Sequence, residues 1–86
     1  MDPEARVVLL SRPGCHLCDD ARAVIKSVCA DLGVGWSERN IAEDAQLERR
    51  YREQIPVTLV DGEQHDFWRV DAQRLRAALT RRRDRS

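Results

Sequence analysis

The sequence lacks a net charge, a long apolar run and an even number of cysteines. Its 15 basic and 15 acidic residues balance, so no overall field attracts nucleic acid or an anionic membrane. No stretch approaches the roughly 18 apolar residues of a membrane-spanning helix, and residues 1–6 lack the apolar run of a signal peptide. Three cysteines without the spacing of a secreted disulfide scaffold favour a reducing compartment. We therefore expect a cytoplasmic protein without nucleic-acid or membrane partners.

The length of 86 residues indicates one domain and leaves no room for a second. We expect residues 1–80 to form this domain and residues 81–86 to form a basic, frayed C-terminal tail. Nothing in the sequence demands an oligomer, so we expect a monomer.

The first half of the chain predicts a strand, a turn and a helix. The apolar run of residues 6–11 is typical of a central strand covered on both faces. Residues 12–14, with a proline and a glycine, predict the turn out of it. Apolar residues then follow helical spacing from about residue 16 to residue 32, and Gly33 supplies the expected stop.

The second half predicts strands over residues 34–40, 57–60 and 64–68, and a helix over about residues 42–53. Pro56 cannot continue that helix, and Asp61-Gly62 predicts a two-residue hairpin turn. Asp71 is a suitable N-cap for a last helix.

The resulting order is β-α-β-α-β-β-α, an α/β fold. Right-handed crossovers make the first two strands parallel, and the tight turn makes the last two antiparallel. We expect a four-stranded mixed sheet of order 2-1-3-4, flanked by three helices on its two faces. In such folds, active groups gather at the carboxyl end of the first strand.

The residues Cys15-His16-Leu17-Cys18 lie at that strand end, where the first helix begins. A cysteine at a helix N-terminus meets backbone N–H groups without an intrahelical partner and the positive end of the helix dipole. Both effects favour a thiolate over a thiol. Cys18, one turn later, is close enough to attack a mixed disulfide formed on Cys15. The pattern predicts a thiol–disulfide redox site.

The segment Ser11-Arg12-Pro13-Gly14-Cys15-His16-Leu17-Cys18, an acidic helix, and Ile55-Pro56-Val57 ahead of a hairpin together resemble the glutaredoxins. More closely, the chain resembles the small glutaredoxin-like proteins of the thioredoxin superfamily, over about residues 6–80. The resemblance implies a thioredoxin fold and an enzyme of cell redox homeostasis and electron transport. It makes Cys15 the nucleophile and Cys18 the resolving thiol.

The resemblance also assigns supporting residues. Arg12, where many glutaredoxins carry a lysine, and a protonated His16 are expected to stabilise the thiolate, while Asp19 and Asp20 oppose it. Pro56 corresponds to the cis-proline that faces the two cysteines in this superfamily. The backbone of the preceding Ile55 is then expected to bind the backbone of a substrate, as an added strand would.

One segment departs from the glutaredoxin pattern. Glutaredoxins usually carry Gly-Gly-x-Asp where this chain has Trp68-Arg69-Val70-Asp71. Asp71 is kept, and Arg69 offers a partner for a carboxylate, so Arg69, Val70 and Asp71 are expected to bind substrate, with glutathione as co-substrate. The alternative is that Trp68 only covers the sheet and Asp71 only caps the last helix.

The first hypothesis for function is a disulfide reductase acting on disulfide-containing proteins or glutathione mixed disulfides. Its electron donor is glutathione or a thioredoxin-reductase-type enzyme, and no bound cofactor or metal is expected. A second hypothesis is a zinc or iron–sulfur module that uses Cys15 and Cys18, although no further Cys or His pair completes the site. The third is a redox-sensing adaptor without turnover. We expect Cys29 in the core and His65 on the surface of the hairpin.

Overall fold

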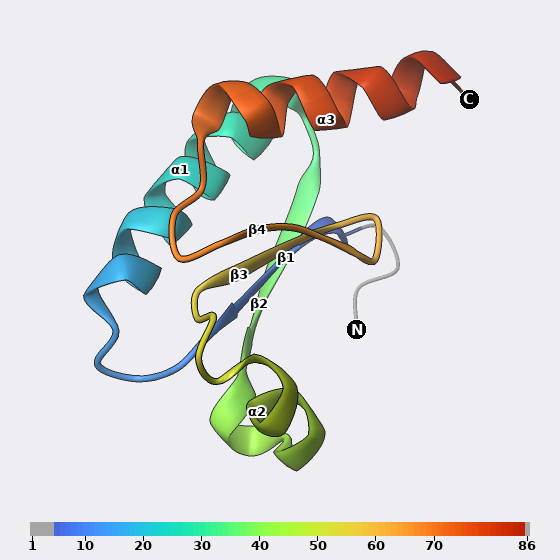
Figure 1. The fold of residues 1–86 in the computed structure, drawn as a ribbon. Coiled ribbons are helices and arrows are strands. Elements are labelled where there is room, and N and C mark those ends of the chain that lie inside the picture. The colour runs from blue at the N-terminus through green and yellow to red at the C-terminus, as the bar shows by residue number, and fades with distance from the viewer. Residues whose placement is uncertain (1–4, 86) are drawn as a thin grey trace.

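A computed structural model gives the backbone of residues 5–85 and their side chains, apart from those of residues 67 and 81–85. The elements follow the predicted order (Figure 1): β1 (Ala5–Ser11), α1 (His16–Leu32), β2 (Gly35–Asn40), the 3₁₀ turn η1 (Ile41–Glu43), α2 (Ala45–Tyr51), β3 (Val57–Val60), β4 (Glu63–Phe67) and α3 (Ala72–Arg85).

The four strands form one sheet in the order β2-β1-β3-β4, which confirms the predicted topology. β1 is parallel to β2 and antiparallel to β3, and β3 is antiparallel to β4. Asp61 and Gly62 connect β3 to β4 with positive φ angles of 52° and 86°, as a hairpin turn of two residues requires. The predicted thioredoxin fold is therefore confirmed.

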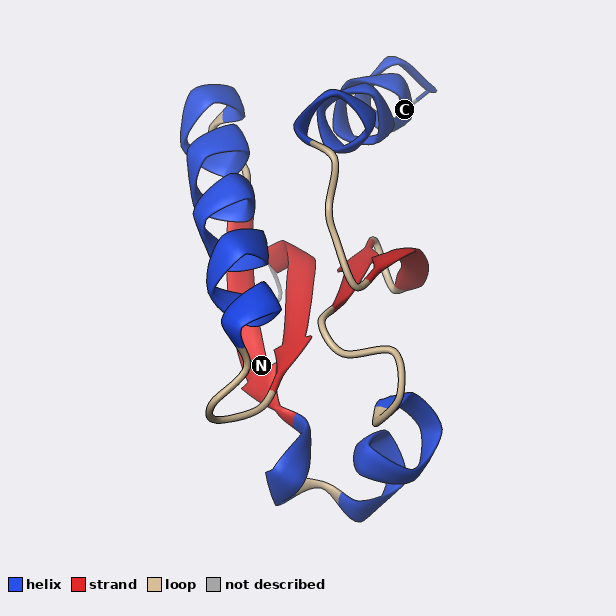
Figure 2. Ribbon diagram, turned by 60° about the vertical axis from the view of Figure 1, so that its left-hand side comes forward, coloured by secondary structure: helices blue, strands red, loops and turns tan. Residues whose placement is uncertain are grey.

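Two apolar clusters form on the sheet. In the first, Val7 and Leu9 of β1 pack with Ile25 of α1 and Leu75 of α3. The second contains residues from β1, α1, η1, α2, the loop before β3, and β3: Leu10, Cys18, Ile41, Tyr51, Ile55 and Val57. Figure 2 shows the strands between the pair α1 and α3 and the separate helix α2. Cys29 is buried in the first cluster, as predicted.

The helix predicted over residues 42–53 is shorter and begins later. Asn40 caps the short turn η1, and Asp44 then starts α2 by accepting hydrogen bonds from the backbone N–H groups of Gln46 and Leu47 at 3.0 and 3.2 Å. An aspartate that binds these N–H groups favours a helix start over a helix interior. α2 ends at Tyr51, before the Ile55-Pro56 segment.

α3 begins after its predicted cap, because Asp71 accepts the N–H groups of Gln73 and Arg74 at 2.8 and 3.1 Å. The helix continues to Arg85, past residue 80, and its end projects beyond the sheet (Figure 1). Residues 1–4 and 86 of the expected domain and tail lie outside the described residues. No described helix combines the length and the apolar character that crossing a bilayer requires.

The expected surface position of His65 is wrong. Thr58 pairs with Asp66 and Leu59 pairs with Gln64, so His65 is the extra residue of a β-bulge in β4. The bulge breaks the alternation of side chains along the strand. The side chains of His65 and Asp66 are only 13% and 15% exposed, and Arg74 of α3 pairs with Asp66 at 3.2 Å.

Candidate functional site

Cys15 is the N-cap residue of α1, at the carboxyl end of β1. Its backbone is extended, with φ −96° and ψ 111°, and follows Gly14, whose φ of 79° closes the turn out of the strand. Its Sγ accepts a hydrogen bond from the backbone N–H of Cys18 at 3.2 Å. The half-buried sulfur therefore lies against the open N–H groups of the helix, as the sequence predicts.

Cys18 is 1% exposed and belongs to the second apolar cluster. Burial, together with its hydrogen bond to the Cys15 side chain, raises the pKa of Cys18 to about 12. A backbone hydrogen bond with Arg12 and the charge of Arg22 oppose this rise. Cys18 is therefore a protonated thiol at neutral pH, one turn from Cys15.

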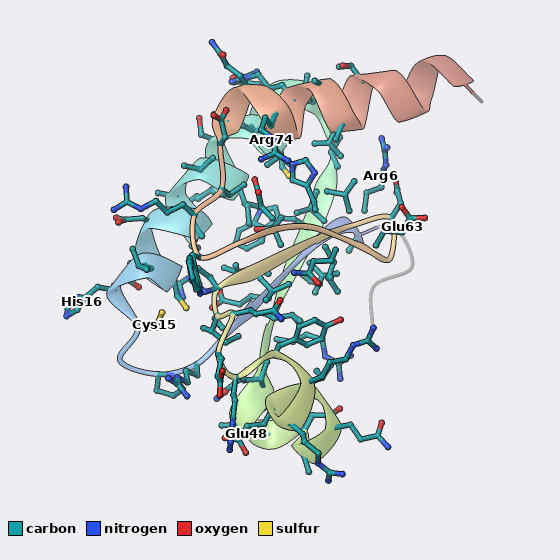
Figure 3. All side chains as sticks on the ribbon, in the orientation of Figure 1. Arg6, Cys15, His16, Glu48, Glu63 and Arg74 are labelled. Carbon is teal, nitrogen blue, oxygen red and sulfur yellow. The ribbon has the colours of Figure 1, made fainter. Side chains whose placement is uncertain are left out.

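Arg12 and His16 are both exposed. Within the described part of the chain, neither side chain hydrogen bonds or pairs with Cys15. Figure 3 shows the His16 ring pointing out from the start of α1, away from the Cys15 sulfur. Their role in stabilising the thiolate stays a prediction, and any effect acts through solvent at longer range.

Arg22 is the charged residue that the sequence interpretation missed. Its guanidinium binds Glu38 of β2 through Nε at 2.7 Å and Nη2 at 2.6 Å, and Asp19 through Nη1 at 2.7 Å. Glu38 also accepts the hydroxyl of the buried Ser11 at 2.6 Å. The position of Arg22, four residues after Cys18, can be read from the sequence. Its pairing with Glu38, 16 residues away, cannot.

This network fixes the start of α1 to the end of β2. The Arg22 guanidinium lowers the pKa of Glu38, with a smaller contribution from the Ser11 hydroxyl. Asp19, which was expected to oppose a thiolate, is paired with Arg22. The network borders a hollow of about 200 Å³ behind the cysteine loop, lined by Ser11, Arg12, Pro13, Arg22, Glu38 and Asn40.

The Ile55–Pro56 peptide bond is cis, as predicted. The Ile55 side chain belongs to the second apolar cluster, against which Cys15 also packs. The Ile55 backbone N–H and C=O make no hydrogen bond to any described residue. Ile55 is only 8% exposed, and the binding of a substrate backbone by these two groups stays a prediction.

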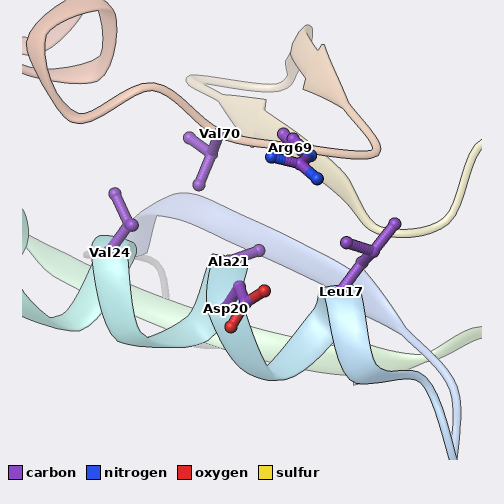
Figure 4. A pocket seen from close by; sticks show the side chains of 6 residues that line it. All are labelled: Leu17, Asp20, Ala21, Val24, Arg69 and Val70. Carbon is purple, nitrogen blue, oxygen red and sulfur yellow. The ribbon is translucent and has the colours of Figure 1, made fainter.

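A groove of about 150 Å³ runs between α1 and the segment that joins β4 to α3 (Figure 4). Arg69 and Val70 line one side, and Asp20 faces them from α1. No ion pair joins Asp20 and Arg69 in the part of the chain that is described. The lining residues are Leu17, Asp20, Ala21, Val24, Arg69 and Val70.

Arg69 and Val70, which the sequence assigns to substrate, thus border the same helix turn as Leu17, the residue before Cys18. Asp71 does not line this groove and caps α3. Trp68, in the left-handed conformation with φ 66°, completes the segment. The described residues include no group of three or more His, Cys, Asp or Glu placed to hold a metal ion.

Residues 6–80 match the family described as Glutaredoxin-like domain (DUF836). The uncharacterized protein Rv0508 of Mycobacterium tuberculosis is 31% identical over 81 residues, which cover 88% of this chain and 84% of that protein.

Two solved structures extend this comparison. The X-ray structure of target protein XcR50 from X. campestris is 33% identical, with a TM-score of 0.72, and the match covers 87% of this chain and 96% of that one. Fasciola hepatica thioredoxin is 19% identical, with a TM-score of 0.60, over 87% of this chain and 77% of its own, and this similarity shows the fold alone.

Proposed function

Because this chain belongs to the Glutaredoxin-like domain (DUF836) family and has a thioredoxin fold, we propose that it is a thiol–disulfide oxidoreductase. One observation carries the proposal. The Cys15 sulfur accepts a backbone N–H at the start of α1, and the buried thiol of Cys18 lies beside it. A half-buried nucleophile next to a protonated second thiol is the arrangement that disulfide exchange needs.

In the first step, the Cys15 thiolate attacks one sulfur of a substrate disulfide. A bond forms between Cys15 and that sulfur, the substrate S–S bond breaks, and the other substrate sulfur leaves as a thiolate. In the second step, Cys18 gives its proton to the thiolate released in the first step or to water, and attacks the Cys15 sulfur. The bond between Cys15 and the substrate sulfur breaks, and that sulfur leaves as a thiolate. The product is a Cys15–Cys18 disulfide and a substrate reduced by two electrons.

Burial supports the order of these steps. A thiol whose pKa is about 12 does not compete with Cys15 for the substrate at neutral pH. It reacts once the mixed disulfide has placed an electrophilic sulfur one helical turn away. The backbone groups of Ile55, which have no hydrogen-bond partner among the described residues, and the Arg69-Val70 wall support a substrate chain bound beside Cys15.

A reductant must return two electrons to the Cys15–Cys18 disulfide. We propose either two glutathione molecules, which leave as glutathione disulfide, or a thioredoxin-reductase-type flavoenzyme. The substrates are disulfide-containing proteins or glutathione mixed disulfides. The cytoplasmic location, the monomeric state and the absence of nucleic-acid and membrane partners stay predictions.

The test uses three serine variants, C15S, C18S and C29S, with a small disulfide as substrate. We expect C15S to lose reduction entirely, C18S to accumulate a mixed disulfide detectable by mass spectrometry, and C29S to match the wild type. Running the assay with glutathione and its reductase, and then with a thioredoxin reductase, identifies the donor. A mixed disulfide that forms equally in C15S would contradict the proposal.

The same purified protein distinguishes the other hypotheses. Stoichiometric zinc or visible cluster absorption would favour a metal module, its remaining ligands coming from a second chain or from glutathione. A trapped mixed disulfide without turnover by either donor would favour a redox-sensing adaptor.

A further inference from the structure

Trp68 is an exposed tryptophan held in an unusual backbone conformation beside the proposed site. Its side chain is largely open to solvent, with 53% of the residue exposed, and its φ is 66°. Bulky L residues rarely adopt this left-handed region, because Cβ approaches the backbone too closely. A tryptophan kept there is a reason to look for a function.

Hydrogen bonds fix both the backbone and the ring of Trp68. The backbone N–H donates to the carbonyl oxygen of Pro56 at 2.7 Å and to that of Gln54 at 3.3 Å. The indole Nε1–H donates to the carbonyl oxygen of Glu53 at 3.0 Å. The ring is thereby fixed against the segment that contains the cis peptide bond.

The position of Trp68 joins the two parts of the proposed substrate site. On one side it bonds to the segment that includes Ile55 and Pro56. On the other side, the next two residues, Arg69 and Val70, form the wall of the groove next to Leu17. A chain that pairs with the Ile55 backbone and enters this groove passes the exposed indole.

The chemistry of this segment favours a polypeptide over a small anionic thiol compound. The Asp71 carboxylate already accepts the two N–H groups at the start of α3, so these groups are not free to bind a ligand carboxylate, and Arg69 is the cation that lines the groove. The indole offers a broad apolar face that is oriented in advance. Such rigid aromatic residues are typical anchors for polypeptide chains.

We propose that Trp68 is a specificity-determining residue that contacts the polypeptide next to the substrate cysteine and selects protein disulfides over glutathione mixed disulfides. This inference rests on the proposed oxidoreductase function. Trp68 acts on recognition and leaves the intrinsic reactivity of Cys15 unchanged.

The test measures attack alone, in a C18S background, so that it does not depend on the electron donor. The substrates are insulin with its disulfide bonds intact and the mixed disulfide of glutathione with cysteamine. The variants are W68G, which removes the ring and fits the positive φ, and W68F, which keeps an aromatic face. W36F is the matched control, because Trp36 of β2 packs against the first apolar cluster, which is formed by β1, α1, β3 and α3.

We expect W68G to lower the second-order rate constant for insulin by about tenfold and W68F by less than about threefold. The rate for the glutathione mixed disulfide and the alkylation rate of Cys15 should not fall. Equal effects of W68G on both substrates, or none, would overturn the role of Trp68. If C18S alone attacked neither substrate, the proposed function itself would fail.

Fluorescence gives a second measurement without a change at Trp68. In W36F with C18S, Trp68 is the sole tryptophan. Its emission should shift when Cys15 forms a mixed disulfide with a cysteine-containing peptide and stay constant with glutathione. An identical response to both ligands would count against selection by the ring.

Discussion

Cys15 is half-buried, whereas Cys18, one helical turn later, is enclosed in the cluster that also contains Leu10 and Val57. Burial raises the pKa of Cys18 to about 12 and also raises the pKa of Cys29. A residue type that occurs three times in the chain therefore takes different roles according to its contact with solvent. Cys15 is partly open to solvent, whereas Cys18 and Cys29 are buried in different clusters.

We predict that iodoacetamide modifies one thiol of the reduced native protein quickly at pH 8. In C15S, the two remaining thiols should react at least about tenfold more slowly than free cysteine, because burial keeps them protonated and inaccessible. Mass spectrometry before and after addition of urea counts the modified thiols. Rapid native labelling of C15S would mean that Cys18 or Cys29 is accessible.

His65 predicts a dependence of stability on pH. Burial lowers the pKa of His65, the charge of Asp66 raises it, and the charge of Arg74 lowers it. The unfolded chain, with a histidine pKa near 6.5, then binds a proton more readily than the folded protein. The stability that depends on a neutral His65 should be fully present above about pH 6.5. It should be lost as the pH drops through that value toward the lower pKa of the folded state.

Urea unfolding at several pH values between about 7.5 and 5 measures this effect. H65Q should remove part of the loss on acidification, because the variant no longer takes up a proton at this position. An unchanged slope in H65Q would mean that His65 accepts its proton without cost.

At the scale of elements, a few side chains tie each helix to the sheet or set its first turn. Arg22 joins α1 to β2 through Glu38, and Asp71 and Asp44 start α3 and α2. Arg22 lies on the helix that Cys15 caps, so its pair with Glu38 also holds the start of α1 against the sheet.

E38Q should lower the free energy of unfolding by about 1 kcal/mol at pH 7, because Arg22 and Ser11 lose a charged acceptor in a partly exposed site. The pKa of Glu38 is lowered in the folded protein. Its contribution is therefore present above the unfolded pKa of about 4.3 and lost as the pH falls below it. D31N, which breaks the exposed pair with Arg76, should change stability by less than about 0.5 kcal/mol.

D71A should destabilise the protein by about 1 kcal/mol, because the N–H groups of Gln73 and Arg74 lose their acceptor. D71N keeps an acceptor oxygen and should cost much less. Urea unfolding compares the two variants, and an equal loss in both would assign the effect to the charge of Asp71.

The whole molecule has two apolar clusters, one with α1 and α3 and one with α2. Cys18 belongs to the second cluster, which includes Ile41, Tyr51 and Ile55, and Cys15 packs against it. In a chain of 86 residues, each cluster is small, so single methylene groups contribute noticeably to folding.

I25V and I41V each remove one methylene from a different cluster and should each cost about 1 kcal/mol. Each should lower Tm by about 4–8 °C. The double variant should lose the sum, because the two residues share no cluster. A loss that departs from the sum by more than about 0.5 kcal/mol would show coupling between the two faces of the sheet.

Five features can be read from the sequence alone: the element order, the strand order, the stop at Gly33, the cap at Asp71 and the cysteine pair at the end of β1. These features follow from local periodicity, backbone restrictions and short turns, which residues near each other in the chain decide. The cis geometry at Pro56 came from the resemblance to a known family.

Three features became visible only in the three-dimensional fold: the pairing of Arg22 with Glu38, the mostly buried side chain of His65 and the hydrogen bonds of Trp68 to residues 53–56. Each depends on side chains that lie far apart in the sequence or on a bulge that changes which face a residue occupies. Periodicity carries no information about such partners, because the sheet register and the packing of the connecting segments bring them together.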